Sequence, residues 1–307
     1  MARNKLRKEK ELNQIKKSTN VFFNIIFIIL SALCIFPIVF VFSISISSET
    51  SIQKNGYQLI PQELSAAAYQ FLWNERGTIL HATFISILVT ALGIILSVLL
   101  TTTMGYVVSR NTYKLKSFYT WVIFIPMIFN GGMLAGYVVN TNILHLRNSI
   151  WALILPLAVS PFNIVICKTF FKTTIPDSIV ESAKIDGAGV IPILTNIYLP
   201  LSKPILAVIS VYTIVGRWNS WFDALIYLPK TEWQPLQLFL RRILVESTRQ
   251  VTDVLDPQMA AEMVKKQMSG AQLKYAMIIF TTLPVLFTYP FFQKYFVKAV
   301  MLGSLKE

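Results

Sequence analysis

Long blocks of apolar residues recur along this chain and constrain its fold more than any other feature. Of the 307 residues, 54% are hydrophobic and only 14% are charged, whereas a soluble domain usually carries about a quarter charged residues. A helix needs about 20 apolar residues to cross a bilayer, and several blocks are that long. Because the bilayer core offers no partners to an unpaired backbone, each crossing segment has to be helical. We therefore predict an all-α membrane protein.

Six transmembrane helices follow from the hydropathy of these blocks. The predicted spans are residues 20–46, 79–108, 117–139, 149–171, 204–228 and 274–296. An even number of spans places both termini on one side of the membrane. Segments on that side hold 17 Lys and Arg residues, against nine on the other side. Basic residues favour the cytoplasm, so we predict that both termini are cytoplasmic (N-in/C-in).

The predicted organisation is a short basic start followed by one membrane domain. Residues 1–19 contain seven Lys and Arg residues and form the cytoplasmic N-terminus, and residues 20–307 form the six-span domain. The apolar block after residue 19 is too long for a secretory leader, so we expect a retained first span. Two connections are long: a cytoplasmic loop at 173–203, and an outer loop at 229–273 that begins as an amphipathic helix and is helix-compatible again over 256–270.

The sequence lacks the patterns that membrane enzymes and ion-driven carriers usually carry. Cys34 and Cys167 lie in apolar blocks, so we expect reduced, buried packing residues and no disulfide or metal framework. His81 and His145 have no metal-ligand spacing around them, and no P-loop is present to bind ATP. Asp223 is the one acid well inside a predicted span, which weakens an ion-coupled carrier or a membrane enzyme as alternatives. The net charge of +13 gathers beside the spans, which points to a membrane surface and to no nucleic acid.

A twenty-residue stretch in the predicted cytoplasmic loop is more elaborate than a simple turn requires. It reads Glu181-Ser-Ala-Lys-Ile-Asp-Gly-Ala-Gly-Val-Ile-Pro-Ile-Leu-Thr-Asn-Ile-Tyr-Leu-Pro200. Pro176 disfavours a helical residue before it, and Asp177 or Ser178 could cap a new helix. Gly187 permits a sharp bend that a side chain would obstruct. We predict a short surface helix, a bend and a second helix leading into the fifth span, which together form a docking element.

This stretch resembles the cytoplasmic signature of ABC importer permeases: Glu-Ala-Ala, three residues, Gly, nine residues, Ile-x-Leu-Pro. The matching residues are Glu181, Ala183, Gly187, Ile197, Leu199 and Pro200, with Ser182 in place of the first alanine, and with Asp186 and Ala188 as in the carbohydrate form. Residues 200–204, 216–222, 289–298 and 303–306 are similar to maltose-type sugar permeases. The segment Phe129-Asn-Gly-Gly132 resembles a segment found in the subgroup of permeases that is linked to complex or uronate-containing oligosaccharides. The similarity covers residues 20 to 307.

The resemblance implies a type I ABC importer permease fold within a larger assembly in the bacterial cell membrane. A second permease subunit pairs with such a chain, two cytoplasmic ATPase subunits bind below, and an extracellular or periplasmic solute-binding protein delivers an oligosaccharide. The chain itself is then no enzyme and carries no cofactor, because ATP and Mg are held by the ATPase. The helix near Val180 would be the coupling helix, and Glu181 would pair with a basic group of the ATPase. The alternative is the same architecture importing another solute, such as a polyol, glycerol phosphate or peptide.

The fifth span carries the candidate substrate contacts. The polar candidates are Arg217, Asn219 and Asp223, since exposing them to lipid would be costly, and the aromatic candidates that could stack on sugar rings are Trp218, Trp221 and Phe222. A second interpretation places the tryptophans in the interfacial aromatic belt and pairs Arg217 with Asp223. The sequence leaves both interpretations open.

Overall fold

The structure is a computed structural model that describes residues 17–252 and 270–304. Within those residues the regular elements are helices, and an isolated bridge between Ser47 and Leu64 is the only β-type pairing. Contacts divide the chain into two compact units, Met1–Phe71 with Asp253–Ile279 and Leu72–Thr252 with Phe280–Glu307. Three of the predicted features lie wholly or partly outside the described residues: the basic start, the 256–270 helix and the end of the C-terminal tail.

The first unit contains α2 (Lys17–Ser45), α3 (Glu49–Asn55) and the beginnings of α4 (Ala67–Asn74) and α17 (Ala271–Ser304). Apolar side chains stay exposed along nearly all of α2, and its buried residues are the last three, Ser43, Ile44 and Ser45. Cys34 is exposed on this helix, so the prediction of a buried residue is wrong for it. The reason is that α2 packs against almost nothing in its own unit, and its apolar surface suits lipid or another subunit.

A polar cluster lies between the end of α2 and the start of α4. Gln272 Nε2 donates to the Ser65 carbonyl at 2.6 Å and ties the first turn of α17 to this unit. The carboxylate of Glu63 accepts hydrogen bonds from Ser48 Oγ at 2.8 Å and Thr50 Oγ1 at 3.0 Å. These two bonds favour the charged form and hold the pKa of Glu63 below its usual value.

Three helices are long and apolar enough to cross a membrane: Lys17–Ser45, Arg76–Ser109 and Ala271–Gln293. Two bent pairs pass the same test when each is taken as one span, Lys116–Ile128 with Gly132–Ile143 at 119° and Val190–Leu201 with Lys203–Trp218 at 80°. The described part of the chain therefore holds three candidate spans, or up to five. The predicted spans at 20–46, 79–108 and 274–296 correspond to α2, α5 and α17.

The predicted span at 149–171 is not one helix. It consists of α8 (Trp151–Ile154) and α9 (Pro161–Thr174), with a non-helical stretch between them. Pro161 occupies the first position of α9, where its missing N–H costs nothing, and Ser160 Oγ accepts from the Asn163 N–H as an N-cap. Pro161 therefore begins a new helix and interrupts the predicted span.

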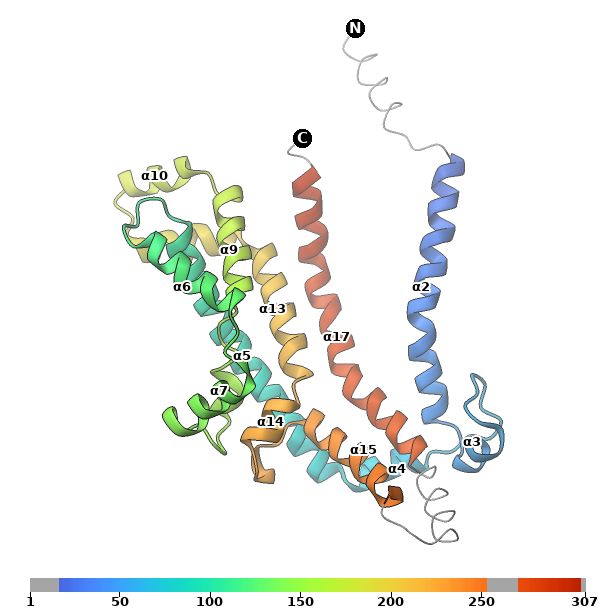
Figure 1. The fold of residues 1–307 in the computed structure, drawn as a ribbon. Helices are drawn as coiled ribbons and strands as arrows, with labels where there is room; N and C mark the ends of the chain where they lie inside the picture. The colour runs from blue at the N-terminus through green and yellow to red at the C-terminus, as the bar shows by residue number, and fades with distance from the viewer. Residues whose placement is uncertain (1–16, 253–269, 305–307) are drawn as a thin grey trace. The chain divides into compact units, whose positions relative to one another are not determined.

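The second unit is built around α5 (Arg76–Ser109), against which α9 and α13 (Lys203–Trp218) pack side by side (Figure 1). Gly105, which has no side chain, allows close packing between α5 and α9. A Cβ at Gly105 would lie 3.0 Å from Cys167 Sγ, so a larger residue would push α9 away. Cys167 is a free, fully buried thiol in this contact, which confirms its predicted packing role.

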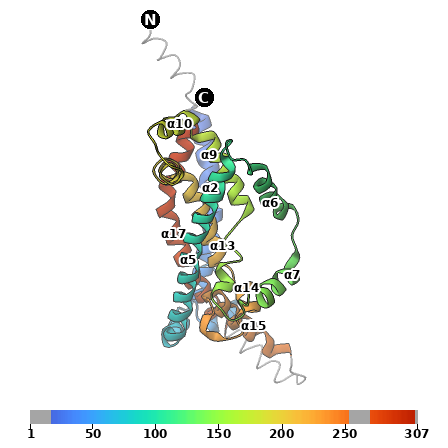
Figure 2. The ribbon, with the colours of Figure 1, turned by 90° about the vertical axis from the view of Figure 1, so that its left-hand side faces the viewer.

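The helix α6 (Lys116–Ile128) packs against α5 and α9 through the buried Ile123, and the chain then continues through α7 (Gly132–Val138) and the π-helical turn η1 (Val139–Ile143) (Figure 2). Gly132 has a φ of +78°, and Asn130 Oδ1 accepts its N–H at 2.9 Å, which fixes the bend between α6 and α7. Neither Gly132 nor Gly136 would bring a Cβ within 4 Å of another described group, so in this part of the chain the two glycines are not sites of close helix packing.

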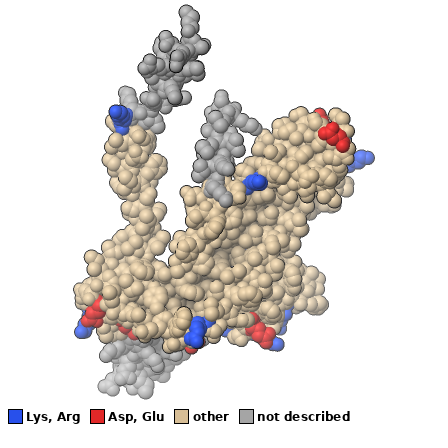
Figure 3. Space-filling model, turned by 180° about the vertical axis from the view of Figure 1, so that it is seen from behind, with Lys and Arg blue, Asp and Glu red and all other residues tan. Residues whose placement is uncertain are grey.

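The two ends of the second unit carry different elements. One end holds α10 (Asp177–Ile185), α11 (Val190–Ile193), the π-helical turn η2 (Leu194–Tyr198) and α12 (Leu199–Leu201). The other holds α14 (Phe222–Tyr227), η3 (Thr231–Trp233) and α15 (Leu236–Thr252) (Figure 1). The amphipathic helix predicted at the start of the outer loop is confirmed, since Leu236 and Leu238 are buried there. Visible charged side chains of this unit lie toward its two ends (Figure 3).

Candidate functional site

The predicted succession of helix, bend and second helix is confirmed in the 173–203 loop. The first helix, α10, begins at Asp177 after Pro176, whose backbone is extended. The predicted capping role of Asp177 or Ser178 is wrong, because the N-cap position is Pro176 and no side chain caps this end. The physical reason is that Asp177 is already the first helical residue and turns its carboxylate toward Arg110, 3.8 Å from Nη1.

Gly187 ends α10 in a Schellman cap. Its φ is +81°, a left-handed conformation that residues with a Cβ adopt only with strain. The Gly187 N–H donates to the Lys184 carbonyl at 3.0 Å, and the Ala188 N–H reaches back to the Ala183 carbonyl at 2.8 Å. Asp186 occupies the C-cap position before it. A Cβ at Gly187 would meet nothing within 4 Å, so the glycine is needed for its backbone conformation alone.

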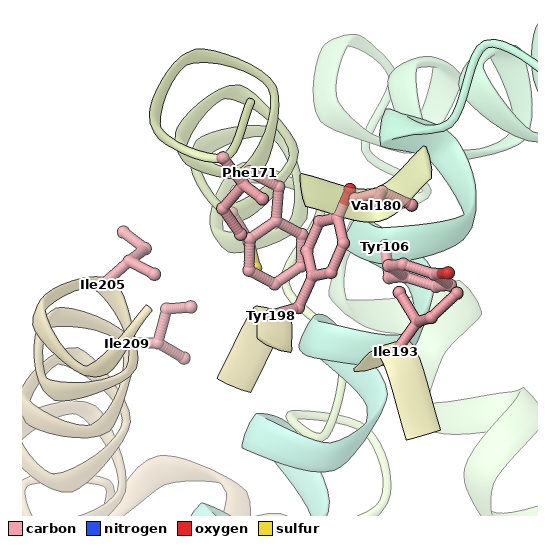
Figure 4. Packing of buried hydrophobic residues seen from close by; sticks show 9 residues of the cluster. Tyr106, Phe171, Val180, Ile193, Tyr198, Ile205 and Ile209 are labelled. Atoms are coloured by element: carbon pink, nitrogen blue, oxygen red, sulfur yellow. The ribbon is translucent and has the colours of Figure 1, made fainter. Parts of the chain in front are cut away.

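The inner side of α10 is anchored in a buried cluster shared with α5, α9, α11, η2 and α13 (Figure 4). Val180 is fully buried in it, and half-buried Ala183 and Ala188 pack against it. Tyr198 of η2 is the aromatic centre: its ring meets Tyr106 of α5 edge-to-face at 4.7 Å and Phe171 of α9 at 5.1 Å. These contacts tie α10 and η2 to α5 and α9, so the element cannot move without them.

Arg110, at the C-cap of α5, adds a polar clasp to this cluster. Its Nη1 donates to Tyr198 Oη at 2.7 Å, and the guanidinium carbon lies 5.9 Å from the centre of the same ring. The ion pair with Asp177 extends the clasp to the first turn of α10. The sequence reasoning missed Arg110 and Tyr198, although Tyr198 lies inside the signature and Arg110 directly follows the second predicted span.

The outer side of α10 and α11 presents apolar and acidic side chains to the surroundings. Ile185 is 86% exposed, and Ile179, Val190 and Ile191 are exposed as well. Glu181, Ser182 and Asp186 share this exposed surface. Large apolar side chains exposed in a group on a polar loop mark a site of interaction with another protein.

The last residues of the signature connect this loop to α13. Ile197 is half-buried against the Tyr198 cluster, and Leu199 is half-buried as well. Pro200 is exposed at the start of α12, a position that needs no backbone N–H. The turn after α12 bends the chain by 80° into α13, so the signature ends where the predicted fifth span begins.

Arg217 lies near the C-terminal end of α13 and is buried, with 5% of its surface exposed. Its Nη1 donates to the Leu153 carbonyl at 2.7 Å and its Nη2 to the Ile154 carbonyl at 3.0 Å, at the C-terminal end of α8. Arg217 and Asp223 therefore do not form the direct ion pair of the second interpretation, because the helix-end carbonyls take the guanidinium, and the charge of Asp223 acts on Arg217 only from a longer distance. Asp223 instead accepts from Ser220 Oγ at 3.2 Å.

Gly93 on α5 gives Arg217 its place, and the sequence reasoning missed it. The Arg217 side chain lies so close to Gly93 that any Cβ there would overlap the guanidinium group. An isolated glycine inside an apolar span was the one available signal of such a close approach.

The remaining candidates of the fifth span do not gather around one point. Trp218 is buried and donates its indole N–H to the Thr281 carbonyl of α17 at 3.0 Å, so it packs inside the unit. Asn219 is exposed at the C-cap of α13. Trp221 faces Arg241 of α15, whose guanidinium carbon lies 3.7 Å from the ring centre. Phe222 is 40% exposed beside it.

A cavity of about 360 Å³ opens between α5, the start of α9 and α13. Its polar lining consists of Ser97, Ser160, Asn163, Tyr212, Thr213 and Arg217. Of the six candidates on the fifth span, only Arg217 lines it. Among residues 17–252 and 270–304, no group of three or more His, Cys, Asp or Glu side chains could hold a metal ion.

Comparison with known proteins identifies the family, although no family model matches the chain. The protein LplC of Bacillus subtilis (strain 168) is 34% identical over 276 residues, which cover 90% of this chain and 90% of LplC. The polygalacturonan/rhamnogalacturonan transport system permease protein YtcP of the same organism is 36% identical over 282 residues, covering 91% and 96%.

The fold agrees with these relatives. A chain in the crystal structure of a bacterial ABC transporter involved in the import of the acidic polysaccharide alginate superposes with a TM-score of 0.77 at 26% identity. The match covers 92% of this chain and 99% of that one. The chain therefore belongs to the carbohydrate ABC transporter permeases and is an integral membrane component of a sugar importer.

Proposed function

We propose that this permease converts ATP-driven closure of a separate ATPase pair into alternating access for an oligosaccharide. The observation that carries the proposal is the construction of α10: it is held from beneath by Val180 and capped by Gly187, and it presents Ile185 outward. A helix anchored on one side and apolar on the other can transmit a push from a partner to the helices behind it.

The ATPase is expected to dock on the exposed surface of α10 and α11. Ile179, Ile185 and Ile191 would fill an apolar groove, and Glu181 would pair with a basic group at its edge. ATP and Mg would be held there, and this chain would carry no cofactor. The clasp of Arg110 on Tyr198 and Asp177 would pass the movement to α5.

The membrane arrangement proposed is six spans within residues 20–307, with both termini in the cytoplasm of a bacterial cell. The loop 173–203 then faces the ATPase, and the loop 229–273 faces the solute-binding protein. The exposed apolar surfaces of α6 and α7, which include Phe129, Met133 and Leu134, suit the second permease subunit. The relatives named for polysaccharide or oligosaccharide transport support a sugar over a polyol, glycerol phosphate or peptide.

The test is ATP-dependent uptake by the assembled transporter in liposomes. Glu181→Lys and Gly187→Pro should reduce sugar-stimulated ATP hydrolysis while leaving membrane insertion intact, because both change the docking helix and neither touches a span. Gly189→Ala is the matched control, since Gly189 lies in the same loop with an ordinary φ of −74°. Unchanged stimulation in both variants, or uptake by this chain without any ATPase, would contradict the proposal.

A further inference from the structure

We propose that the cavity beside Arg217 receives an acidic sugar unit, whose carboxylate supplies the direct ionic partner that Arg217 lacks among the described residues. The inference rests on the proposed function, because it names the sugar class that passes along the same import path. It starts from the charge of Arg217 and from the residues around it.

Arg217 is a buried cation, and no carboxylate of the described residues lies within ion-pair distance of it. A guanidinium has five N–H donors. In the described part of the chain, the bonds to the Leu153 and Ile154 carbonyls are the ones that use them, and the Nε atom is buried there with no acceptor. Among the described residues the one Lys or Arg ion pair is Arg110 with Asp177, so no carboxylate there is in direct contact with Arg217, and the charge of Asp223 acts on it only from a longer distance. A buried charge of this kind is costly unless an anion or a ligand compensates it.

Specific features of the fold hold Arg217 in this buried position. Gly93 leaves the space that the guanidinium occupies, and the carbonyls at the end of α8 fix two of its nitrogens. If Arg217 served packing alone, an apolar side chain could fill the same volume and would need neither the space at Gly93 nor the two carbonyl acceptors. Two fixed nitrogens and spare N–H groups form a preorganised receptor for a carboxylate.

The rest of the cavity suits sugar hydroxyls. Thr213 Oγ1 lies 3.4 Å from Ser97 Oγ, and both side chains are buried in the wall. Ser160 and Asn163 add groups at the start of α9 that donate and accept hydrogen bonds. Tyr212 is 57% exposed at the cavity and offers a ring to a sugar face. The volume of about 360 Å³ lies near the lower limit for small-molecule sites, so one sugar unit fits rather than a whole chain.

The charge decides between an acidic and a neutral sugar. A neutral unit would bond to the hydroxyl and amide groups equally well but would leave Arg217 without a carboxylate in direct contact. An acidic unit would bond to the same hydroxyl and amide groups and would also pair with Arg217, so the two kinds of sugar differ in the single interaction with the guanidinium. This makes a matched pair of ligands, identical except for the carboxylate, the sharpest probe.

The experiment measures uptake of trigalacturonate and of its neutral methyl ester by the complete transporter in liposomes, with its binding protein at saturation. Arg217→Gln should lower the ratio of acid to ester uptake on the order of tenfold or more, with ester uptake retained. Arg217→Lys, which keeps the charge, should preserve part of the ratio. Comparing ratios between variants cancels the preference of the binding protein.

A second measurement does not depend on a folded Arg217 variant. Ser160→Cys, in a background with Cys34→Ser, places one reactive thiol in the cavity wall. Trigalacturonate should protect this thiol from a charged thiol reagent in the assembled transporter, and the methyl ester should protect it much less. Equal protection by the two sugars, or none by either, would overturn the inference.

The outcomes separate this inference from the proposed function. Absence of ATP-dependent uptake for every oligosaccharide tried would overturn the proposed function. ATP-dependent uptake of both sugars with an unchanged ratio in Arg217→Gln would overturn only the acidic-sugar site. If that variant also separates the two permease subunits during purification, the counter-charge is an acid of the partner and the inference is again overturned.

Discussion

The α10 end of the second unit and the Arg217 region are built on opposite principles. At α10 the backbone is capped, Val180 is fully buried, and Arg110 contacts an acceptor, a ring and a carboxylate. Around Arg217 a charged group is buried with donors to spare beside an open cavity. A segment that transmits movement needs satisfied, closely packed contacts, whereas a segment that receives a polar ligand has to keep unsatisfied groups available.

The largest effect on stability is expected from a larger residue at Gly93, and a protein that tolerated one would contradict the contrast between the two regions. Gly93→Ala should destabilise the protein by about 2–4 kcal/mol, because the new methyl displaces the guanidinium from two carbonyls that then stay unpaired. Thermal unfolding of the purified transporter in detergent measures the loss. Gly77→Ala is the matched control on the same helix, where a Cβ meets nothing within 4 Å. Equal unfolding temperatures for the two variants would show that Arg217 is not held as described.

At the α10 end the largest effect is expected from the cap. Gly187→Ala should cost about 1–2 kcal/mol, because a residue with a Cβ is strained at a φ of +81°. Limited proteolysis of the 173–203 loop should therefore become faster. Gly187→Asn should cost less, because asparagine tolerates the left-handed region better than other residues with a side chain. If alanine and asparagine behave alike, backbone strain is not what the glycine relieves.

The clasp of Arg110 should contribute less than the cap. Tyr198→Phe keeps both edge-to-face ring contacts and removes only the hydroxyl that accepts from Arg110, so a loss of about 1 kcal/mol is expected. A double-mutant cycle with Arg110→Gln isolates the coupling between the two side chains. Additive losses would mean that the hydrogen bond contributes nothing to stability.

The smallest effect on stability is expected at Ile185, which touches little of its own chain. Ile185→Ser should change the unfolding free energy by no more than about 0.5 kcal/mol, since the side chain is 86% exposed. Co-purification with the ATPase subunits should nevertheless fall clearly. Val180→Ser, on the buried side of the same helix, should do the reverse and destabilise the chain first. Identical behaviour of the two variants would remove the distinction between the two sides of α10.

Local chemistry made the α10 end predictable. Pro176 before the helix and Gly187 after it mark the element in the sequence, because each restricts or frees the backbone at its own position. The capping prediction for Asp177 failed because an aspartate at a helix start can also pair with a distant cation. Arg110 is 67 residues away in sequence from Asp177, and only the packing of α5 reveals the pair.

The Arg217 region was predictable only in its residue type. A cation inside a span indicates that a polar partner is nearby. The sequence suggested Asp223 because residue types identify side-chain acceptors but not free backbone carbonyls. The acceptors at Leu153 and Ile154 became available because the predicted span at 149–171 breaks before Pro161. Backbone groups freed at a helix end carry no signature in the residue types.

The empty space around Gly187 has a consequence for how such importers diversify. The glycine answers only to the geometry of its own backbone and meets no neighbouring atom within 4 Å, so a different partner surface makes no new demand on it. Exposed side chains such as Ile185 can then be substituted to fit another ATPase subunit while the glycine cap stays the same. In this arrangement Gly187 preserves the conformation of the loop, and the exposed side chains beside it determine which ATPase subunit binds.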